Sequence, residues 1–141
     1  MKVEQDVTSD KSVKESAKIV KKELDGKPLD LLINNAGIAN VGTGVIEGAS
    51  IKNGKTMFEV NTWGMMRVTQ AFLPFIRRGP GKSRIINFAS GAVKANPVGS
   101  GVYNMSKHAV IGLTKTLRNE LAPFGIPVSY THLTLPTMLW V

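Results

Sequence analysis

Tyr103 and Lys107 stand four residues apart in a segment with helical periodicity, so both side chains project from one face of the expected helix. A free tyrosine hydroxyl has a pKa of about 10, and a neighbouring ammonium group favours the phenolate form. A pair of this kind can exchange a proton with a substrate near neutral pH. Ser90, which ends a preceding apolar run, could donate a hydrogen bond to the same substrate oxygen. Tyr-x-x-x-Lys alone occurs by chance on many helices, so the positioning elements matter.

Extended and helical patterns alternate along the chain. Such alternation predicts an α/β fold with a parallel sheet and helices on both faces. Pro74 is expected to kink or end the middle helix, and the run LDLLI is apolar enough for a strand buried on both faces. The expected strands are 3–7, 29–33, 84–89 and 126–130, and the expected helices are 9–24, 55–78 and 103–122.

Three of these expected strands end in residues that could bind a ligand, since open parallel sheets bind ligands at the carboxyl ends of their strands. The three sites are Asp6-Val7, Asn34-Asn35-Ala36-Gly37 (NNAG) and Ser90-Gly91. Each also has a simpler explanation when taken alone. Asp6 suits a helix cap, NNAG suits a turn, and Ser-Gly is an ordinary loop pair.

Together with Tyr103 and Lys107, these motifs resemble those of the short-chain dehydrogenase/reductases over about residues 2–128. The resemblance adds Asn61, in FEVNTWG, to a catalytic set that contains Ser90, Tyr103 and Lys107. It implies that Tyr103 is the general acid/base and that Ser90 orients the substrate oxygen. By the same resemblance, Lys107 binds the nicotinamide ribose and Asn61 holds a proton-relay water.

The resemblance also implies a cofactor, NAD or NADP, and hydride transfer between NAD(P)(H) and a small-molecule alcohol or carbonyl substrate. The implied cofactor-binding residues are Asp6 and Val7 at the adenine, then Asn35, Ala36, Gly37, Tyr103 and Lys107. The segments VTQAFLPFIRR and LRNELAPFGIPVS are most similar to the retinol, steroid and hydroxybutyrate dehydrogenase branch. The choice between NAD and NADP and the identity of the substrate stay open.

The sequence has no G-x-G-x-x-G turn between a strand and a helix, the element that binds a dinucleotide pyrophosphate. The expected fold is therefore a partial doubly wound, Rossmann-like sheet that lacks its first two strands and its C-terminal strand. Residues 1–129 are expected to form the incomplete NAD(P)-binding domain, and 130–141 a tail outside the family pattern. The alternative is a catalytically dead truncated fragment that binds a partner through its exposed sheet edge. In the isolated chain we expect millimolar dinucleotide binding at best.

Composition narrows the function classes. The 141 residues contain no cysteine, which excludes disulfides and thiolate nucleophiles, and two histidines alone cannot form a metal site. No apolar run approaches the ~18 residues of a membrane span, and MKVEQDVTSD does not resemble a signal peptide. We therefore expect an intracellular protein, cytoplasmic or organelle-associated.

The net charge of +8 does not indicate a nucleic-acid partner, because no aromatic residues alternate with the basic clusters to stack on bases. A solvated basic surface is the simpler interpretation. The resemblance also implies a homo-oligomer, formed through the long apolar helices that carry Asn61 and Tyr103.

Overall fold

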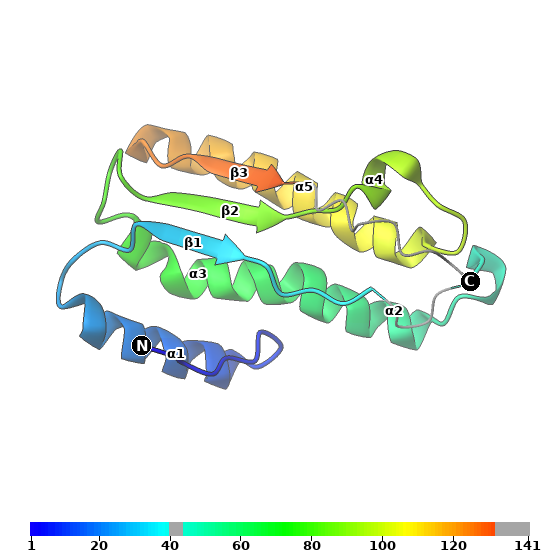
Figure 1. The fold of residues 1–141 in the computed structure, drawn as a ribbon, viewed down its shortest axis with the longest axis horizontal. Helices are drawn as coiled ribbons and strands as arrows, with labels where there is room; N and C mark the ends of the chain where they lie inside the picture. The colour runs from blue at the N-terminus through cyan, green and yellow to red at the C-terminus, as the bar shows by residue number, and fades with distance from the viewer. Residues whose placement is uncertain (40–43, 132–141) are drawn as a thin grey trace.

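The computed structural model describes residues 1–39 and 44–131. Three parallel strands in the order β1-β2-β3 form the sheet, with Ile33 opposite Ile86 and Ile86 opposite Ser129 (Figure 1). The strands are β1 Leu31–Asn34, β2 Arg84–Phe88 and β3 Val128–Thr131. The α-helices are α1 Asp10–Leu24, α2 Ile51–Phe58, α3 Met65–Ile76, α4 Ala92–Ala95 and α5 Gly101–Leu121. Short helical turns are η1 Ile46–Gly48, η3 Ala122–Phe124 and the π-helical η2 Glu59–Gly64.

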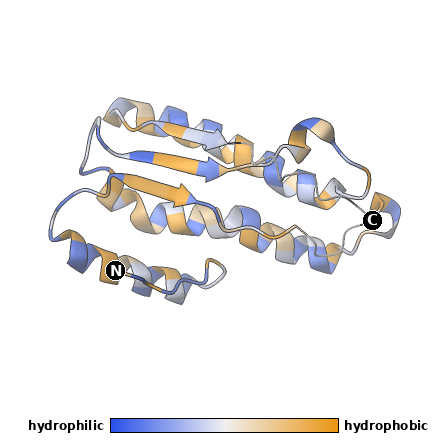
Figure 2. Cartoon of the chain, viewed as in Figure 1, coloured by the Kyte–Doolittle hydropathy of each residue, from blue (hydrophilic) through white to orange (hydrophobic). Residues whose placement is uncertain are grey.

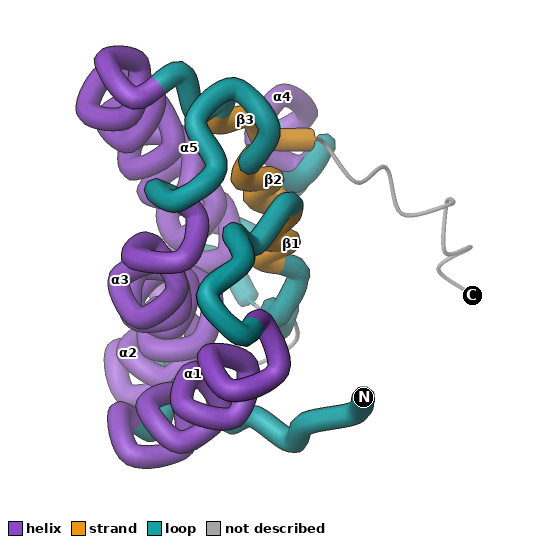
Figure 3. Tube along the Cα trace, turned by 90° about the vertical axis from the view of Figure 1, so that its left-hand side faces the viewer, coloured by secondary structure: helices purple, strands orange, loops and turns teal. Residues whose placement is uncertain are grey.

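The helices α1, α3 and α5 lie on the same side of the sheet (Figure 3). The expectation of helices on both faces is wrong for the described residues, and the strand order gives the reason. Right-handed crossovers that step in one direction, from β1 to β2 to β3, place the connecting helices α3 and α5 on the same face, and α1 packs against α3. The opposite face of β1 is therefore open: Leu31 and Ile33 are 41% and 49% exposed, and burial on both faces was a wrong prediction.

The expected strand at 3–7 is absent, since residues 1–6 have no regular structure. A strand requires a paired neighbour, and here the backbone N–H of Asp6 donates instead to Ser12 Oγ (2.9 Å). In α3, Pro74 neither ends nor breaks the helix before Ile76. Pro74 has no N–H to donate to the Gln70 carbonyl, and both residues are exposed, so the missing helical hydrogen bond lies on the solvent-facing side of α3.

The core lies between the covered face of the sheet and the helices. Hydropathy colouring shows that β1 is apolar along most of its length (Figure 2). Its side chains alternate, so that Leu32 points into the core with Ile85 of β2 and Val128 of β3. The helices contribute Val13, Ala17, Val68, Phe72, Phe75, Ile76, Leu117 and Leu121.

A buried chain of polar side chains crosses this core and joins the strand ends to the helices. Asn34 Nδ2 donates to Asn87 Oδ1 (2.8 Å) and Thr69 Oγ1 (3.0 Å), and Asn87 Nδ2 donates to Thr114 Oγ1 (2.9 Å). These bonds connect β1, β2, α3 and α5, and buried polar groups joined in this way favour one arrangement of the elements. Asn34 is thus the last residue of β1 and not part of the turn. The network fixes the sheet edge from which the NNAG loop and Ser90 emerge.

Candidate active site

Lys107 lies at the centre of the candidate site, on the face of α5 that contacts the end of β2. Its side chain is buried, with only 5% of the residue exposed, and Nζ donates to the carbonyl oxygen of Phe88 (3.0 Å). The same Nζ lies 5.9 Å from the centroid of the Tyr103 ring. Burial lowers the pKa of Lys107 from its ordinary value of 10.5. The pairing predicted from the four-residue spacing is therefore present.

Gly37, the last residue of NNAG, brings the loop after β1 against this pair. A Cβ atom at Gly37 would lie 3.2 Å from Asn61 Oδ1 and 3.2 Å from Lys107 Nζ. Those distances are closer than ordinary contacts to a Cβ, so the absence of a side chain allows the loop backbone to approach both groups. Asn35 and Ala36 precede it in the same exposed loop. The structure thus brings together Gly37, Asn61, Tyr103 and Lys107.

Asn61 lies in the π-helical turn η2 and is fully buried. Its Oδ1 accepts from the backbone N–H of Ile38 (2.8 Å), and its Nδ2 donates to the Ile38 carbonyl (2.9 Å). The amide therefore pairs with both polar groups of one backbone residue, which fixes the loop after NNAG. π-Helical turns occur often at functional sites, and here the turn carries the asparagine that joins the loop to the helix.

Ser106 also belongs to the site, although the sequence reasoning missed it. Its Oγ accepts from Asn61 Nδ2 (3.0 Å) and donates to the backbone carbonyl of Tyr103 (2.7 Å). One hydroxyl thus connects the asparagine of η2 to the first turn of α5. Its contact with Asn61 joins residues forty-five positions apart, so no local pattern in the sequence identified it.

Ser90 lies two residues after Phe88, whose carbonyl binds Lys107, and is buried. Its Oγ accepts from the backbone N–H of Ala92 (3.2 Å), which orients the hydroxyl at the start of α4. Tyr103 is partly buried in the first turn of α5. Ser90 therefore follows the strand that Lys107 contacts, at the carboxyl edge of the sheet.

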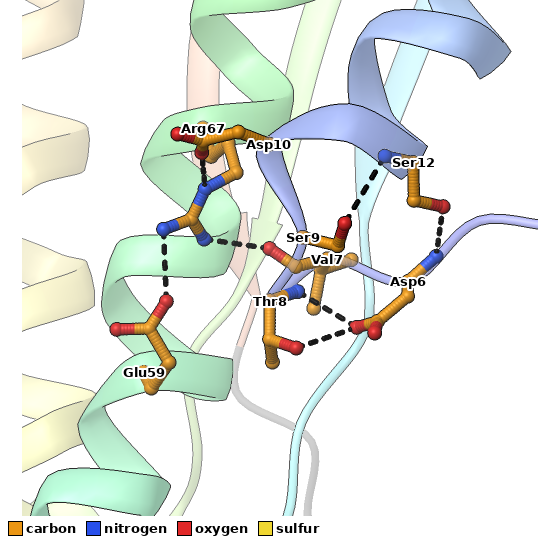
Figure 4. Close-up of polar contacts among 8 residues, drawn as sticks. All are labelled: Asp6, Val7, Thr8, Ser9, Asp10, Ser12, Glu59 and Arg67. Carbon is orange, nitrogen blue, oxygen red and sulfur yellow. Dashed lines mark hydrogen bonds and ion pairs between the residues drawn. The ribbon is translucent and has the colours of Figure 1, made fainter.

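Asp6 does not cap α1. The cap is Ser9, whose side chain accepts from the backbone N–H of Ser12 (3.2 Å) (Figure 4). Asp6 Oδ1 instead accepts from the Thr8 hydroxyl (2.7 Å) and the Thr8 backbone N–H (2.9 Å). The hydroxyl bond first, and then the backbone bond, lower the pKa of Asp6 below its ordinary value. The exposed carboxylate is held ionised in a local turn.

Arg67 of α3, which the sequence reasoning missed, holds the segment that carries Asp6 and Val7 in place (Figure 4). It donates through Nη1 to the Val7 carbonyl (2.7 Å) and through Nη2 to Glu59 (2.8 Å), and its Nε pairs with Asp10. Burial acts to lower its pKa, but the hydrogen bonds to Asp10 and Glu59 outweigh burial and raise it.

Val7 also contacts the site helix directly. A Cβ at Gly64 would lie 2.8 Å from Val7 Cγ2, so the last residue of η2 must be small where Val7 packs. The structure thus places Val7 against the turn that carries Asn61.

The chain matches known proteins along most of its length. The family model described as short chain dehydrogenase matches residues 1–135. The chain belongs to the short-chain dehydrogenase/reductase family. Among curated relatives, the mitochondrial D-beta-hydroxybutyrate dehydrogenase of Bos taurus is 36% identical over 129 residues, covering 90% of this chain and 36% of its own. The resemblance to the family is confirmed, and a hydroxybutyrate dehydrogenase is among its curated relatives.

Solved structures of the family superpose on most of the chain. NAD+-bound xylitol dehydrogenase has a TM-score of 0.82 at 28% identity and covers 91% of this chain and 48% of its own. NADPH-bound carbonyl reductase from chicken fatty liver also has a TM-score of 0.82, at 31% identity, and covers 90% and 55%. The Rossmann-like α/β fold expected from the sequence is confirmed.

The curated relatives of this chain are longer than the chain itself. The chain spans 44% of the short-chain dehydrogenase ptmH of Penicillium ochrochloron, another curated relative, and 36% of the bovine enzyme. The family match runs past residue 129, and β3 includes Tyr130 and Thr131. The rest of the expected tail, 132–141, lies outside the described residues, so its separation from the family domain stays a prediction. No helix among residues 1–39 and 44–131 has the length and apolarity to cross a membrane.

Proposed function

We propose that this chain carries the catalytic residues of an NAD(P)-dependent oxidoreductase that interconverts an alcohol and a carbonyl compound. The observation that carries the proposal is the buried ammonium of Lys107, which lies beside the Tyr103 ring and against the Gly37 backbone. A buried cation is costly unless it has partners, and the Phe88 carbonyl supplies one of them. Family membership adds independent support.

In this proposal Tyr103 exchanges the proton of the substrate oxygen. During alcohol oxidation its phenolate removes the hydroxyl proton while the carbon–oxygen bond becomes a carbonyl; in reduction Tyr103 returns that proton. The positive charge of Lys107 favours the phenolate form. Ser90 hydrogen-bonds the substrate oxygen, and Asn61 fixes the adjoining loop and holds the relay water.

The residues present fit NAD or NADP, which when bound accepts or supplies the hydride. The Gly37 backbone forms a cradle that a Cβ would fill, directly beside Lys107 Nζ. An ammonium group has three donors, and one of these reaches the Phe88 carbonyl within the described residues. Lys107 and Tyr103 would hold the nicotinamide ribose, Asn35, Ala36 and Gly37 would line the cleft, and Asp6 and Val7 would hold the adenine.

Tyr103→Phe tests the role of Tyr103, because phenylalanine keeps the ring and removes the proton donor. The assay uses a chimaera in which residues 1–131 replace the matching segment of a full-length relative. We expect kcat to fall at least ~100-fold, while binding of NADPH or NADH stays nearly intact because Lys107 and the loop at 35–37 still hold the cofactor. Tyr130→Phe is the matched control and should retain activity. If Tyr103→Phe retains more than about a hundredth of the activity, the proposed role of Tyr103 is wrong.

We also propose that the chain self-associates through the helices that carry Asn61 and Tyr103. An apolar groove of about 570 Å³ lies between α2, η2 and α5, with Phe58 and Val102 in its lining. Trp63 and Met105, which also line the groove, are 49% and 57% exposed, which is unusual for such large apolar side chains. Light scattering at tens of micromolar should show a dimer or larger species that Trp63→Glu dissociates. A monodisperse wild-type monomer would contradict the proposal.

A further inference from the structure

A second groove, of about 590 Å³, runs between α1 and α3. None of its lining residues is a member of the candidate active site. The floor is apolar and the rim is basic. The floor consists of Ala17, Ala71 and Phe75, and the basic rim consists of Lys11, Lys14, Lys18 and Lys21 of α1.

The rim lysines form a regular row. They recur at intervals of three, four and three residues, which places all of them on one face of α1. Lys11 and Lys21 are ten residues apart, so the row extends about 15 Å along the helix axis. On another amphipathic helix, acidic residues with the same spacing of three and four would also lie along one edge. A row of carboxylates on such a helix would therefore match the lysines in spacing.

The charge of the groove is not neutralised by its own carboxylates. Glu15 pairs with Lys18 (2.9 Å), and Asp10 pairs with Arg67. Within the described part of the chain, Lys11, Lys14 and Lys21 form no ion pair. Two acidic groups in the lining are thus already occupied, and the remaining lysines give the groove an unbalanced positive charge. That charge favours an anionic ligand.

We propose that this groove binds an acidic amphipathic helix of a partner protein. A volume of about 590 Å³ along about 15 Å gives a mean cross-section of roughly 40 Å². An α-helix about 10 Å across has a cross-section of roughly 80 Å². The groove is therefore too narrow for a whole helix, but it can hold the side chains of one helical face. Apolar side chains of the partner would enter the floor, and its carboxylates would pair with the lysines on the rim.

Two other anionic surfaces fit the groove less well. Binding in a membrane interface requires apolar side chains that project beside the lysines, whereas Phe75 and Ala17 are buried at the floor. The exposed apolar residue of α1, Ile19, lies about 160° around the helix from Lys21. Single-stranded nucleic acid requires exposed aromatic rings for stacking, and the aromatic ring of this lining, Phe75, is buried.

Fluorescence anisotropy with the 141-residue chain tests the proposal. The probe is a dye-labelled amphipathic peptide with glutamates along one edge of a leucine face; the comparison peptide has the same composition with its glutamates spread around the helix. We expect the first peptide to bind with a Kd below about 100 μM and Lys14→Glu/Lys21→Glu to weaken it at least tenfold. The control Lys82→Glu/Lys115→Glu changes the net charge equally at exposed lysines outside the groove, and should weaken binding less than about threefold.

A neutral variant separates the floor from the rim. Ala71→Gln fills the partly buried floor without changing the charge. It should also weaken binding of the peptide at least about fivefold, while the circular dichroism spectrum of the protein stays unchanged. Equal losses in the two charge variants, equal binding of the two peptides, or a Kd above about 1 mM would overturn the proposal. The proposal would also be overturned if the peptide does not bind while phosphatidylserine vesicles or a single-stranded oligonucleotide bind in a way that depends on Lys14 and Lys21.

Discussion

Replacement of Ser106 by alanine tests whether its hydroxyl joins η2 to α5. Ser106 is 0% exposed, and its Oγ both accepts from Asn61 Nδ2 and donates to the Tyr103 carbonyl. Alanine preserves the packing but leaves one donor and one acceptor in a buried place without this partner. A buried polar group left in that condition costs about 1–3 kcal/mol. We expect Ser106→Ala to lower the free energy of unfolding by that amount.

Ser83 provides a control with the same substitution and the same burial. It is also 0% exposed, but its Oγ has no hydrogen-bond partner among the described residues. Burial of a hydroxyl without a partner is unfavourable, so Ser83→Ala should leave stability unchanged or raise it by about 1 kcal/mol. The two variants therefore should shift stability in opposite directions or differ by at least about 1 kcal/mol.

Urea unfolding followed by circular dichroism measures both variants. With a slope of about 2 kcal/mol per molar urea, a loss of 1–3 kcal/mol lowers the midpoint by about 0.5–1.5 M. Ser83→Ala should leave the midpoint within about 0.2 M of wild type or raise it by up to about 0.5 M. If both variants lower the midpoint equally, the hydroxyl of Ser106 has no special role and the inferred connection between η2 and α5 is wrong.

Two further predictions concern charged side chains. Arg67→Ala should lower the free energy of unfolding by about 1–2 kcal/mol, a value reduced because the arginine is partly exposed. The same variant should speed hydrogen exchange at residues 6–10, and Arg67→Lys should lose less stability. Unchanged exchange in Arg67→Ala would contradict the role given to Arg67. The lowered pKa of Lys107 means that the unfolded chain binds more protons between that pKa and 10.5, so wild type should gain stability relative to Lys107→Met as pH rises through this window. Urea midpoints of both proteins at pH 7 and about 10 measure this gain, and a constant or growing advantage of Lys107→Met would refute it.

The helices were predicted well because their signals are local. The expected helix at 103–122 is α5 Gly101–Leu121, and that at 9–24 is α1 Asp10–Leu24. Apolar residues at helical spacing identify such helices without knowledge of the rest of the fold. The expected strand at 3–7 failed for the opposite reason, since a strand depends on a neighbour that the local sequence does not reveal.

The same distinction separates the parts of the site that were predicted from those that were missed. Tyr103 and Lys107 were found because one helical turn brings them together. Arg67 contacts Val7 and Asp10 across about sixty positions of sequence, and Ser106 contacts Asn61 across forty-five. Such contacts exist only after the elements pack. No periodicity reports them, so these residues became visible only in the structure.

The long-range contacts also explain why a partial sheet can still hold its catalytic residues together. Three strands alone leave one face of β1 open. Apolar packing on the other face does not by itself determine the position of α5 along the sheet. Hydrogen bonds are directional, so the bonds from Asn87 to Thr114 and from Lys107 to Phe88 allow one register of α5 on β2. The Asn61–Ser106 bond then sets η2 against the same helix. The placement of Lys107 against Gly37 and the end of β2 thus depends on buried polar contacts more than on the extent of the sheet.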